Sequence, residues 1–312
     1  MKRFLVWAVS VVCLCGFISF PNSVLSAPEG KTWKDIDYVG DGIVGHRLDI
    51  YLPEKGTGPF PAIVYIYGSA WFSNNLKASA GMFSPSLLKA GFAVVAMNHR
   101  GSREAIFPAQ IQDAKAAIRF IRANAATYNL DPGWIGVTGG SSGGHLTALL
   151  GTSGGVKKHT VGGATCDLEG SLGNHTGTDS SVQAACDWFG PTDFRTMDSC
   201  GSQMNHDAAD SPESTLIGGA IQENPDKCAL ANPATYVDAE DPPFLIFHGN
   251  ADPLVPSCQS DLLHKRLIEA GVDSTYVQVS KAGHGTGLTG PINLDMMARF
   301  FSESLAAWRE GK

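Results

Sequence analysis

A run of small residues at positions 139–144, GGSSGG, contains the spacing Gly-x-Ser-x-Gly twice. The serine is Ser141 in one register and Ser142 in the other. Small residues on both sides of a serine allow a sharp turn from strand to helix that presents its hydroxyl group, because the backbones can pack closely there. A plain glycine-rich loop has the same composition, so the motif alone does not decide between a nucleophile and a turn.

Two further side chains follow expected strands later in the chain. Asp252 comes shortly after the apolar run FLIFHG, and His284 lies five residues beyond STYVQV. Each could be an ordinary turn or loop residue. The order Ser, Asp, His at the carboxyl ends of strands is, however, the α/β-hydrolase arrangement. His284 would act as the base for the serine and Asp252 would orient its imidazole, so we predict a catalytic triad of Ser141, Asp252 and His284.

The elements that must position these residues alternate between strand-like and helix-like segments. Continuous apolar runs are typical of strands buried on both faces, and amphipathic segments with a 3.6-residue period predict helices. The chain therefore predicts an α/β fold with a mostly parallel central sheet, helices on both faces and two loop insertions, at 151–181 and 195–235. The expected strands cover 46–52, 61–68, 92–98, 134–140, 243–249 and 274–279, and the expected helices cover 76–91, 108–126, 143–151, 257–271 and 292–308.

The N-terminal segment 1–27 has a composition of its own. Lys2 and Arg3 precede an apolar run, which ends in the small residues Ser26 and Ala27. This order is typical of a secretory signal peptide, although the apolar run is near the lower length limit for a membrane span. We expect a signal peptide over 1–27, a single catalytic domain over 28–312, and a secreted or periplasmic protein without membrane attachment after cleavage.

Five cysteines follow the expected signal peptide, and a secreted protein can form disulfides. An odd number leaves at least one thiol without a partner in the same chain. Cys200 with Cys228, or Cys166 with Cys186, could connect surface loops, but the sequence does not choose among the pairings. The five are Cys166, Cys186, Cys200, Cys228 and Cys258.

Composition restricts the partners. The chain of 312 residues is 43 % hydrophobic and carries a formal net charge of −7. It has no basic run longer than a pair such as Lys157–Lys158, so no nucleic-acid partner is expected. Histidine and cysteine do not occur at zinc-finger spacing, so neither a metal nor another cofactor is expected.

Several stretches resemble one branch of the α/β-hydrolase superfamily, which holds hormone-sensitive-lipase-like, acetyl-xylan and feruloyl esterases. GGSSGGHL is similar to that branch's G-x-S-A-G-G-H-L turn. The resemblance also covers the continuous stretch 98–146, together with SPESTLIGG, PPFLIFHGNADPLVP and AGHG. It implies that Ser141 is the nucleophile and that the Ser142 amide belongs to the oxyanion hole. Ser142 stands where the branch has alanine, and its hydroxyl could compete for His284.

The loop after the expected strand 61–68 would supply the other oxyanion donor. The branch has H-G-G-G-W there, whereas this chain has YGSAW at 67–71. The donor could be the amide of Ser69 or of Ala70. Trp71 could line the acyl pocket or simply cover the edge of the core. Trp188 and Phe189 follow a buried strand and could form a wall of the pocket; Trp71 and Trp188 are the candidate substrate-binding residues.

The resemblance implies a secreted serine carboxylesterase that releases acetyl or feruloyl groups from plant cell-wall polysaccharides through an acyl-enzyme. Its partner would be a small ester or an acylated oligosaccharide; the oligomeric state is left open. A peptidase with the same core is an alternative, but such enzymes usually carry a propeller domain for which 312 residues leave no room. A non-catalytic binding protein is a second alternative, which the intact Ser, Asp and His argue against.

Overall fold

The computed structural model describes residues 29–311, so the expected signal peptide lies outside the described residues. The central sheet has eight strands in the order β1-β2-β4-β3-β5-β8-β9-β10. β2 pairs antiparallel with β1 and with β4, and the strands from β4 to β10 pair in parallel. The mostly parallel sheet is therefore confirmed. The strands of this sheet are β1 (Glu29–Asp37), β2 (Arg47–Pro53), β3 (Phe60–Ile66), β4 (Ala93–Met97), β5 (Leu130–Gly140), β8 (Ala184–Trp188), β9 (Phe244–Gly249) and β10 (Ser274–Val279).

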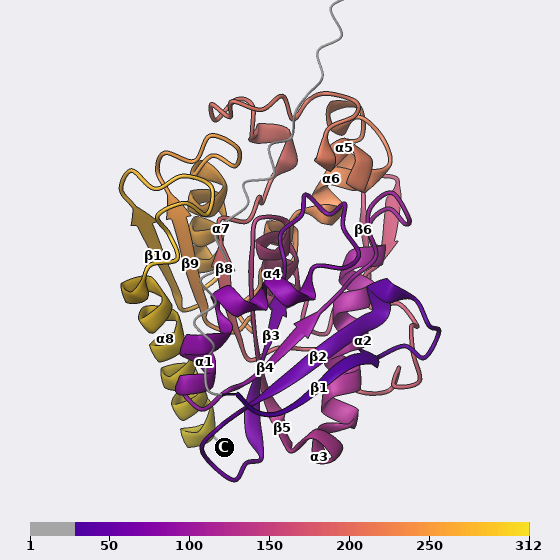
Figure 1. Ribbon diagram of the computed structural model, residues 1–312. Coiled ribbons are helices and arrows are strands. Elements are labelled where there is room, and N and C mark those ends of the chain that lie inside the picture. Colours follow the sequence, from indigo (N-terminus) through magenta and orange to yellow (C-terminus); the bar gives the residue numbers. More distant parts are fainter. Residues whose placement is uncertain (1–28, 312) are drawn as a thin grey trace, which may run out of the picture.

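Helices cover both faces of the sheet (Figure 1). One hydrophobic core contains side chains of α2, α4 and α7, and a second core on the other face contains side chains of α1 and α8. The middle strands are buried along their whole length, which is why they read as continuous apolar runs. The α-helices are α1 (Ser84–Lys89), α2 (Ala109–Ala123), α3 (Ala125–Tyr128), α4 (Ser142–Thr152), α5 (Pro212–Ile217), α6 (Pro225–Ala231), α7 (Cys258–Glu269) and α8 (Pro291–Glu310).

The segment 76–91 is expected to be helical with a break or kink at Pro85, and the structure confirms the break. It forms the 3-10 helix η2 (Lys77–Met82) and then α1, whose first turn contains Pro85. Proline has no amide hydrogen to donate, and the first turn of a helix does not need one, so Pro85 is accommodated at the start of a helix rather than inside one.

The two insertions contain more regular structure than expected. The first holds the hairpin of β6 (Lys158–Val161) and β7 (Ala164–Asp167). The second holds α5 and α6; α6 contacts the hairpin of β6 and β7 and lies beside β6 in Figure 1. The remaining short helices are η1 (Val44–His46), η3 (Phe194–Thr196), η4 (Ile221–Glu223) and η5 (Pro233–Thr235).

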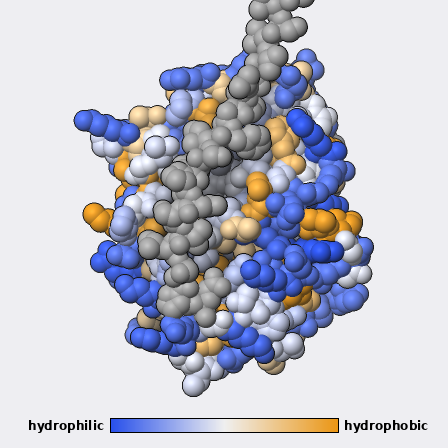
Figure 2. Space-filling view, viewed as in Figure 1, coloured by the Kyte–Doolittle hydropathy of each residue, from blue (hydrophilic) through white to orange (hydrophobic). Residues whose placement is uncertain are grey.

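The outer surface is mostly hydrophilic on the face that Figure 2 shows, with hydrophobic residues in small separate groups. Large hydrophobic side chains that are exposed include Ile43, Ile106, Ile268 and Ile292. Isolated residues of this kind are ordinary on a soluble surface. Within residues 29–311, no helix has the length and apolar character needed to cross a bilayer.

Candidate active site

Ser141 occupies the sharp turn between β5 and α4. Its φ of 57° and ψ of −126° lie in a region that side chains rarely adopt, whereas Ser142 already belongs to α4. The glycines on either side are required by close packing: a Cβ on Gly139 would lie 2.4 Å from the Ile66 carbonyl oxygen, and one on Gly143 would lie 2.2 Å from the same atom. The turn therefore uses the register of Gly139, Ser141 and Gly143, and Ser141 is the serine that it presents.

The three predicted triad residues meet at the carboxyl edge of the sheet. Ser141 follows β5, Asp252 follows β9 and His284 follows β10. The Nε2 atom of His284 lies 2.9 Å from Ser141 Oγ, and its Nδ1 atom lies 2.8 Å from Asp252 Oδ2. An ionised carboxylate such as that of Asp252 can only accept a hydrogen bond. Nδ1 of His284 therefore carries the proton, and Nε2 is left to accept the proton of the Ser141 hydroxyl.

Asp252 accepts three hydrogen bonds and has a second histidine close by. Its Oδ1 atom accepts the amides of Leu254 and Val255, at 2.9 and 3.0 Å, and its Oδ2 atom faces the imidazoles of His284 and His248. Burial raises the pKa of Asp252, but the interactions with His248 and His284 outweigh burial and hold the pKa well below its usual value. The carboxyl group is therefore ionised throughout the neutral pH range, as the orienting member of a triad must be.

Two amides are suitably placed for a negatively charged oxygen. The Ser142 amide is at the first position of α4, where helix amides have no partner in the helix. The Ser69 amide donates to the Ser142 hydroxyl at 2.8 Å and is thus engaged, whereas no hydrogen bond among residues 29–311 uses the Ala70 amide. The structure therefore favours Ala70 over Ser69 as the second donor.

The loop that carries Ala70 has an unusual backbone. Ala70 and Trp71 have φ angles of 52° and 60°, which glycine would adopt without strain and other residues adopt at a cost. Two contacts hold the loop in place: the Ser102 amide donates to the Trp71 carbonyl at 2.8 Å, and the Trp71 indole donates to His145 Nδ1 at 3.3 Å. Burial lowers the pKa of His145 to about 4, so its imidazole is neutral and its Nδ1 atom can accept.

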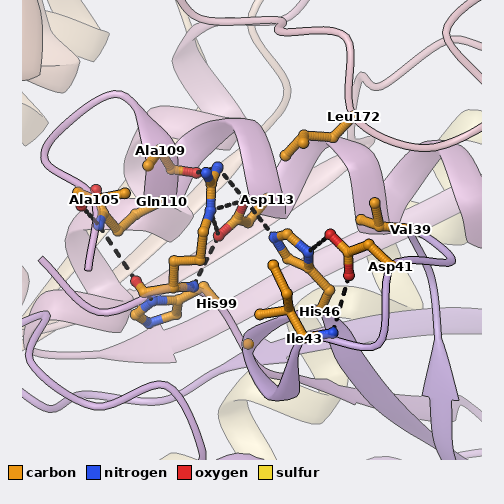
Figure 3. Close-up of polar contacts among 12 residues, drawn as sticks. Val39, Asp41, Ile43, His46, His99, Ala105, Ala109, Gln110, Asp113 and Leu172 are labelled. Carbon is orange, nitrogen blue, oxygen red and sulfur yellow. Dashed lines mark hydrogen bonds and ion pairs between the residues drawn. The ribbon is translucent and has the colours of Figure 1, made fainter.

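An ion-pair cluster fixes the segment that ends at Ser102 (Figure 3). Asp113, which is fully buried on α2, accepts from the Arg100 guanidinium at 2.7 Å and from the Arg100 amide at 2.8 Å. His46 bridges Asp113 and Asp41 at 3.2 and 2.8 Å. Burial lowers the pKa of His46, but the hydrogen bonds to the two carboxylates outweigh it and raise the pKa. Asp113 thus has a structural role.

Trp71 and Trp188, the predicted substrate-binding residues, both have buried side chains in the structure. Trp188 is completely buried, stacks on Phe247 at 4.1 Å between ring centroids, and donates to Thr138. β8 is an inner strand of the sheet, so its side chains enter the cores rather than the open edge. Trp71 is 1 % exposed and packs edge-on against His145 and Phe194.

Phe189 is the aromatic residue that contacts the triad. It follows β8 with a φ of 48°, and its ring lies edge-on to His284 at 4.8 Å between centroids. The same ring would contact a Cβ on Gly140 at 3.0 Å, so it fills the space beside the serine turn. Its position directly after a buried strand predicts a place at the wall of the pocket, and the structure puts its ring beside His284 and the serine turn.

The disulfide pairings considered from the sequence are wrong, because Cys200 is bonded to Cys258, with 6.4 Å between their Cα atoms. Cys186 lies within the sheet on β8, and Cys228 lies on α6, where its Sγ atom faces the Ile221 carbonyl. Cys166, Cys186 and Cys228 are free and buried. The disulfide joins the second insertion to the first turn of α7, close to Asp252 in the chain.

A cavity of about 670 Å³ lies at the other edge of the sheet, near the start of β8, β9 and β10. Phe244, Asp273 and Trp308 contribute to its lining, and none of the triad residues does. It is therefore separate from the candidate active site.

Asp187 is a buried carboxyl group beneath the serine turn. Burial raises its pKa to about 7, the neighbouring His248 and the Gly190 amide acting in the opposite direction. In the unfolded chain its carboxyl group ionises near pH 4. Folded molecules therefore retain a proton that unfolded ones release, and stability falls as the pH rises from about 4 to about 7.

Replacing Asp187 by asparagine should remove this part of the pH dependence. We expect the melting temperature of Asp187→Asn to rise relative to the wild type by several degrees between pH 4.5 and pH 8, which differential scanning calorimetry would measure. Asp295→Asn, at an exposed position on α8, is the control and should track the wild type. A parallel course for Asp187→Asn and wild type would show that Asp187 ionises normally.

Known proteins resemble this chain in sequence and in structure. A structure described as a truncated form of a carbohydrate esterase from gut microbiota is 48 % identical and superposes with a TM-score of 0.86, covering 89 % of this chain and 97 % of that one. A bifunctional GH43-CE protein of Bacteroides eggerthii is also 48 % identical, with a TM-score of 0.84, covering 88 % of this chain and 35 % of that one. The esterase LipQ of Mycobacterium tuberculosis is 31 % identical over 275 residues.

The sheet, the serine turn and these relatives define a member of the α/β-hydrolase superfamily, in its hormone-sensitive-lipase-like esterase branch. More narrowly, the chain belongs to the BD-FAE family, whose family model matches residues 48–267. The matched region contains Ser141 and Asp252 and ends before His284. The alignment with LipQ covers 87 % of this chain but 61 % of LipQ, so the chain spans about three fifths of that relative.

Proposed function

We propose that this chain is a serine carboxylic-ester hydrolase that releases acetyl or feruloyl groups from plant cell-wall polysaccharides. The observation that carries the proposal is the contact of His284 with both Ser141 Oγ and Asp252 Oδ2, at 2.9 and 2.8 Å. A carbohydrate ester as substrate is supported by two relatives that are 48 % identical: one is described as a carbohydrate esterase, and the other as a bifunctional GH43-CE protein.

The residues perform the reaction in two stages. His284 Nε2 removes the proton from Ser141 as Oγ attacks the ester carbonyl, and the Ala70 and Ser142 amides donate to the oxygen that becomes negative. His284 then gives the proton to the departing alcohol, which leaves an acyl group on Ser141. Water, deprotonated by His284, attacks this acyl group and releases the acid. Asp252 keeps the imidazole in the required tautomer in both stages.

We also propose that the protein is exported. The supporting observations are the charged, apolar and small-residue order of segment 1–27 and the Cys200–Cys258 disulfide, since stable disulfides are typical of oxidising compartments. Detection of the processed protein outside the cytoplasm, with a new N-terminus near residue 28, is the expected result. An unprocessed protein in the cytoplasmic fraction would contradict export without affecting the proposed chemistry.

The proposed substrate class is tested by assaying one preparation on a panel of substrates. We expect hydrolysis of p-nitrophenyl acetate, with rates falling as the acyl chain lengthens, and release of acid from acetylated xylan, methyl ferulate or both. The same panel on Ser141→Ala supplies the background. Hydrolysis of simple esters without action on either natural type would retain the esterase chemistry and reject the polysaccharide substrate. Cleavage of amide substrates alone would favour a peptidase.

A further inference from the structure

His248 is a second histidine beside the triad aspartate. It is the penultimate residue of β9 and is completely buried. Its Nε2 atom lies 2.8 Å from the Val255 carbonyl oxygen and 3.4 Å from Asp252 Oδ2, and its Nδ1 atom lies 2.7 Å from Ser260 Oγ. Both neighbours of Nε2 are acceptors, so Nε2 carries a proton, while the Ser260 hydroxyl can donate to Nδ1.

These contacts close a ring around the Asp252 carboxylate. The Val255 amide donates to Asp252 Oδ1, and the carbonyl of the same residue accepts from His248. His248 Nε2 also lies 3.4 Å from Oδ2, the oxygen that accepts from His284, but its proton is directed at the Val255 carbonyl. His248 therefore acts on the carboxylate through the Val255 residue that both of them contact.

The other groups around His248 come from the neighbouring strands and from α7. Asp187 on β8 faces it and, with a pKa raised to about 7 by burial, is mostly protonated below neutral pH. The Phe189 ring lies 6.5 Å from His248 and 4.8 Å from His284 between centroids, so the two imidazoles pack against the same aromatic ring. Ser260 approaches from α7. His248 therefore has partners on all sides and little freedom to move.

We infer that His248 is a positioning residue for catalysis: its Nε2–H group donates to the Val255 carbonyl and so fixes the turn 252–255, whose Val255 amide holds the Asp252 carboxylate in the orientation in which Oδ2 accepts the Nδ1–H group of His284. The inference rests on the proposed function, because it concerns the same triad. Hydrogen bonds to a charged acceptor are among the stronger ones in proteins, and a misaligned carboxylate no longer fixes the imidazole tautomer. The contribution should appear in kcat, since His248 is buried away from the substrate.

Two substitutions of His248 distinguish a donor at the place of Nε2 from a donor at the place of Nδ1. The amide nitrogen of glutamine occupies about the place of Nε2, whereas that of asparagine reaches only to the place of Nδ1. His248→Gln should therefore keep the donor to the Val255 carbonyl and stay within about threefold of the wild type, while His248→Asn should lower kcat for p-nitrophenyl acetate about tenfold or more at unchanged KM. His264→Gln, on α7 and bonded to Ser274, is the control for a histidine outside the site.

A spectroscopic measurement accompanies the kinetics. The proton between His284 Nδ1 and Asp252 should give a far-downfield proton resonance in the wild type and in His248→Gln, and this resonance should shift or vanish in His248→Asn. Equal kcat for His248→Asn and wild type, or an unchanged resonance, would overturn the inference.

Should His248→Asn fail to fold, Ser260→Ala removes only the hydrogen bond at Nδ1 and should lower kcat about threefold; an unchanged kcat would count against the inference. Failure of the proposed function is recognised separately, as wild-type protein without Ser141-dependent ester hydrolysis.

Discussion

Alanine at position 141 is expected to lower kcat for p-nitrophenyl acetate by about four orders of magnitude or more, because the atom that forms the acyl-enzyme is lost. The fold should be unaffected: the Ser141 hydroxyl is near the surface of the site, and its hydrogen bond is to His284. Stopped assays at high enzyme concentration would measure the residual rate, and calorimetry would compare the melting temperatures. A fluorophosphonate should label Ser141 in the wild type, as mass spectrometry of the peptide would show.

Ser142→Ala is the matched control. It removes a hydroxyl one residue away, keeps the Ser142 amide, and releases the Ser69 amide from its bond to Ser142 Oγ. We expect activity within about tenfold of the wild type, since a neutral hydrogen bond contributes on the order of 1 kcal/mol. Wild-type turnover in Ser141→Ala combined with a large loss in Ser142→Ala would move the nucleophile to Ser142. Labelling at neither serine would favour a non-catalytic protein.

Much of the fold could be predicted from local pattern. The buried strands β3, β4 and β9 are continuous apolar runs, and the stripe of Leu294, Met297, Phe301 and Leu305 on α8 faces the second core. The sequence patterns did not predict helices and strands that are short or partly exposed. The hairpin of β6 and β7 alternates between exposed and half-buried positions, and its sequence is as polar as that of a loop. Pro85 looked like a helix breaker because its place in a helix depends on where the helix begins.

The order of Ser141, Asp252 and His284 in the chain, and their positions after strands, were enough to predict that they lie at one edge of the sheet. The carboxyl ends of parallel strands meet at the same edge. Side-chain direction was not available from the sequence, so the burial of Trp188 could not be predicted. Its neighbour Phe189 reaches the site only because the chain turns there with a positive φ. The Cys200–Cys258 bond depends on how the second insertion folds back over α7, and no local pattern encodes that path.

Asparagine at position 252 is the second substitution with a large expected effect. Asp252 Oδ1 accepts the amides of Leu254 and Val255, so the oxygen of an asparagine would take that place and its NH2 group would face His284. Two donors cannot face each other, so the imidazole would keep its proton on Nε2 instead of Nδ1. In that tautomer Nε2 points a hydrogen at Ser141 and cannot accept one. We expect kcat to fall by about four orders of magnitude with little change in KM.

The Asp252→Asn variant also distinguishes the role of Asp252 in orienting His284 from its contribution to the stability of the fold. The lowered pKa of Asp252 means that its ionised form stabilises the fold above about pH 4, and that this contribution is lost as the pH falls further. The variant should therefore melt at a lower temperature than the wild type at pH 7, with a smaller difference near pH 3. Asp261→Asn, exposed on α7, should change neither rate nor stability. A folded Asp252→Asn protein that kept a tenth of the wild-type kcat would show that some other group orients His284, and the triad would then have to be reassigned.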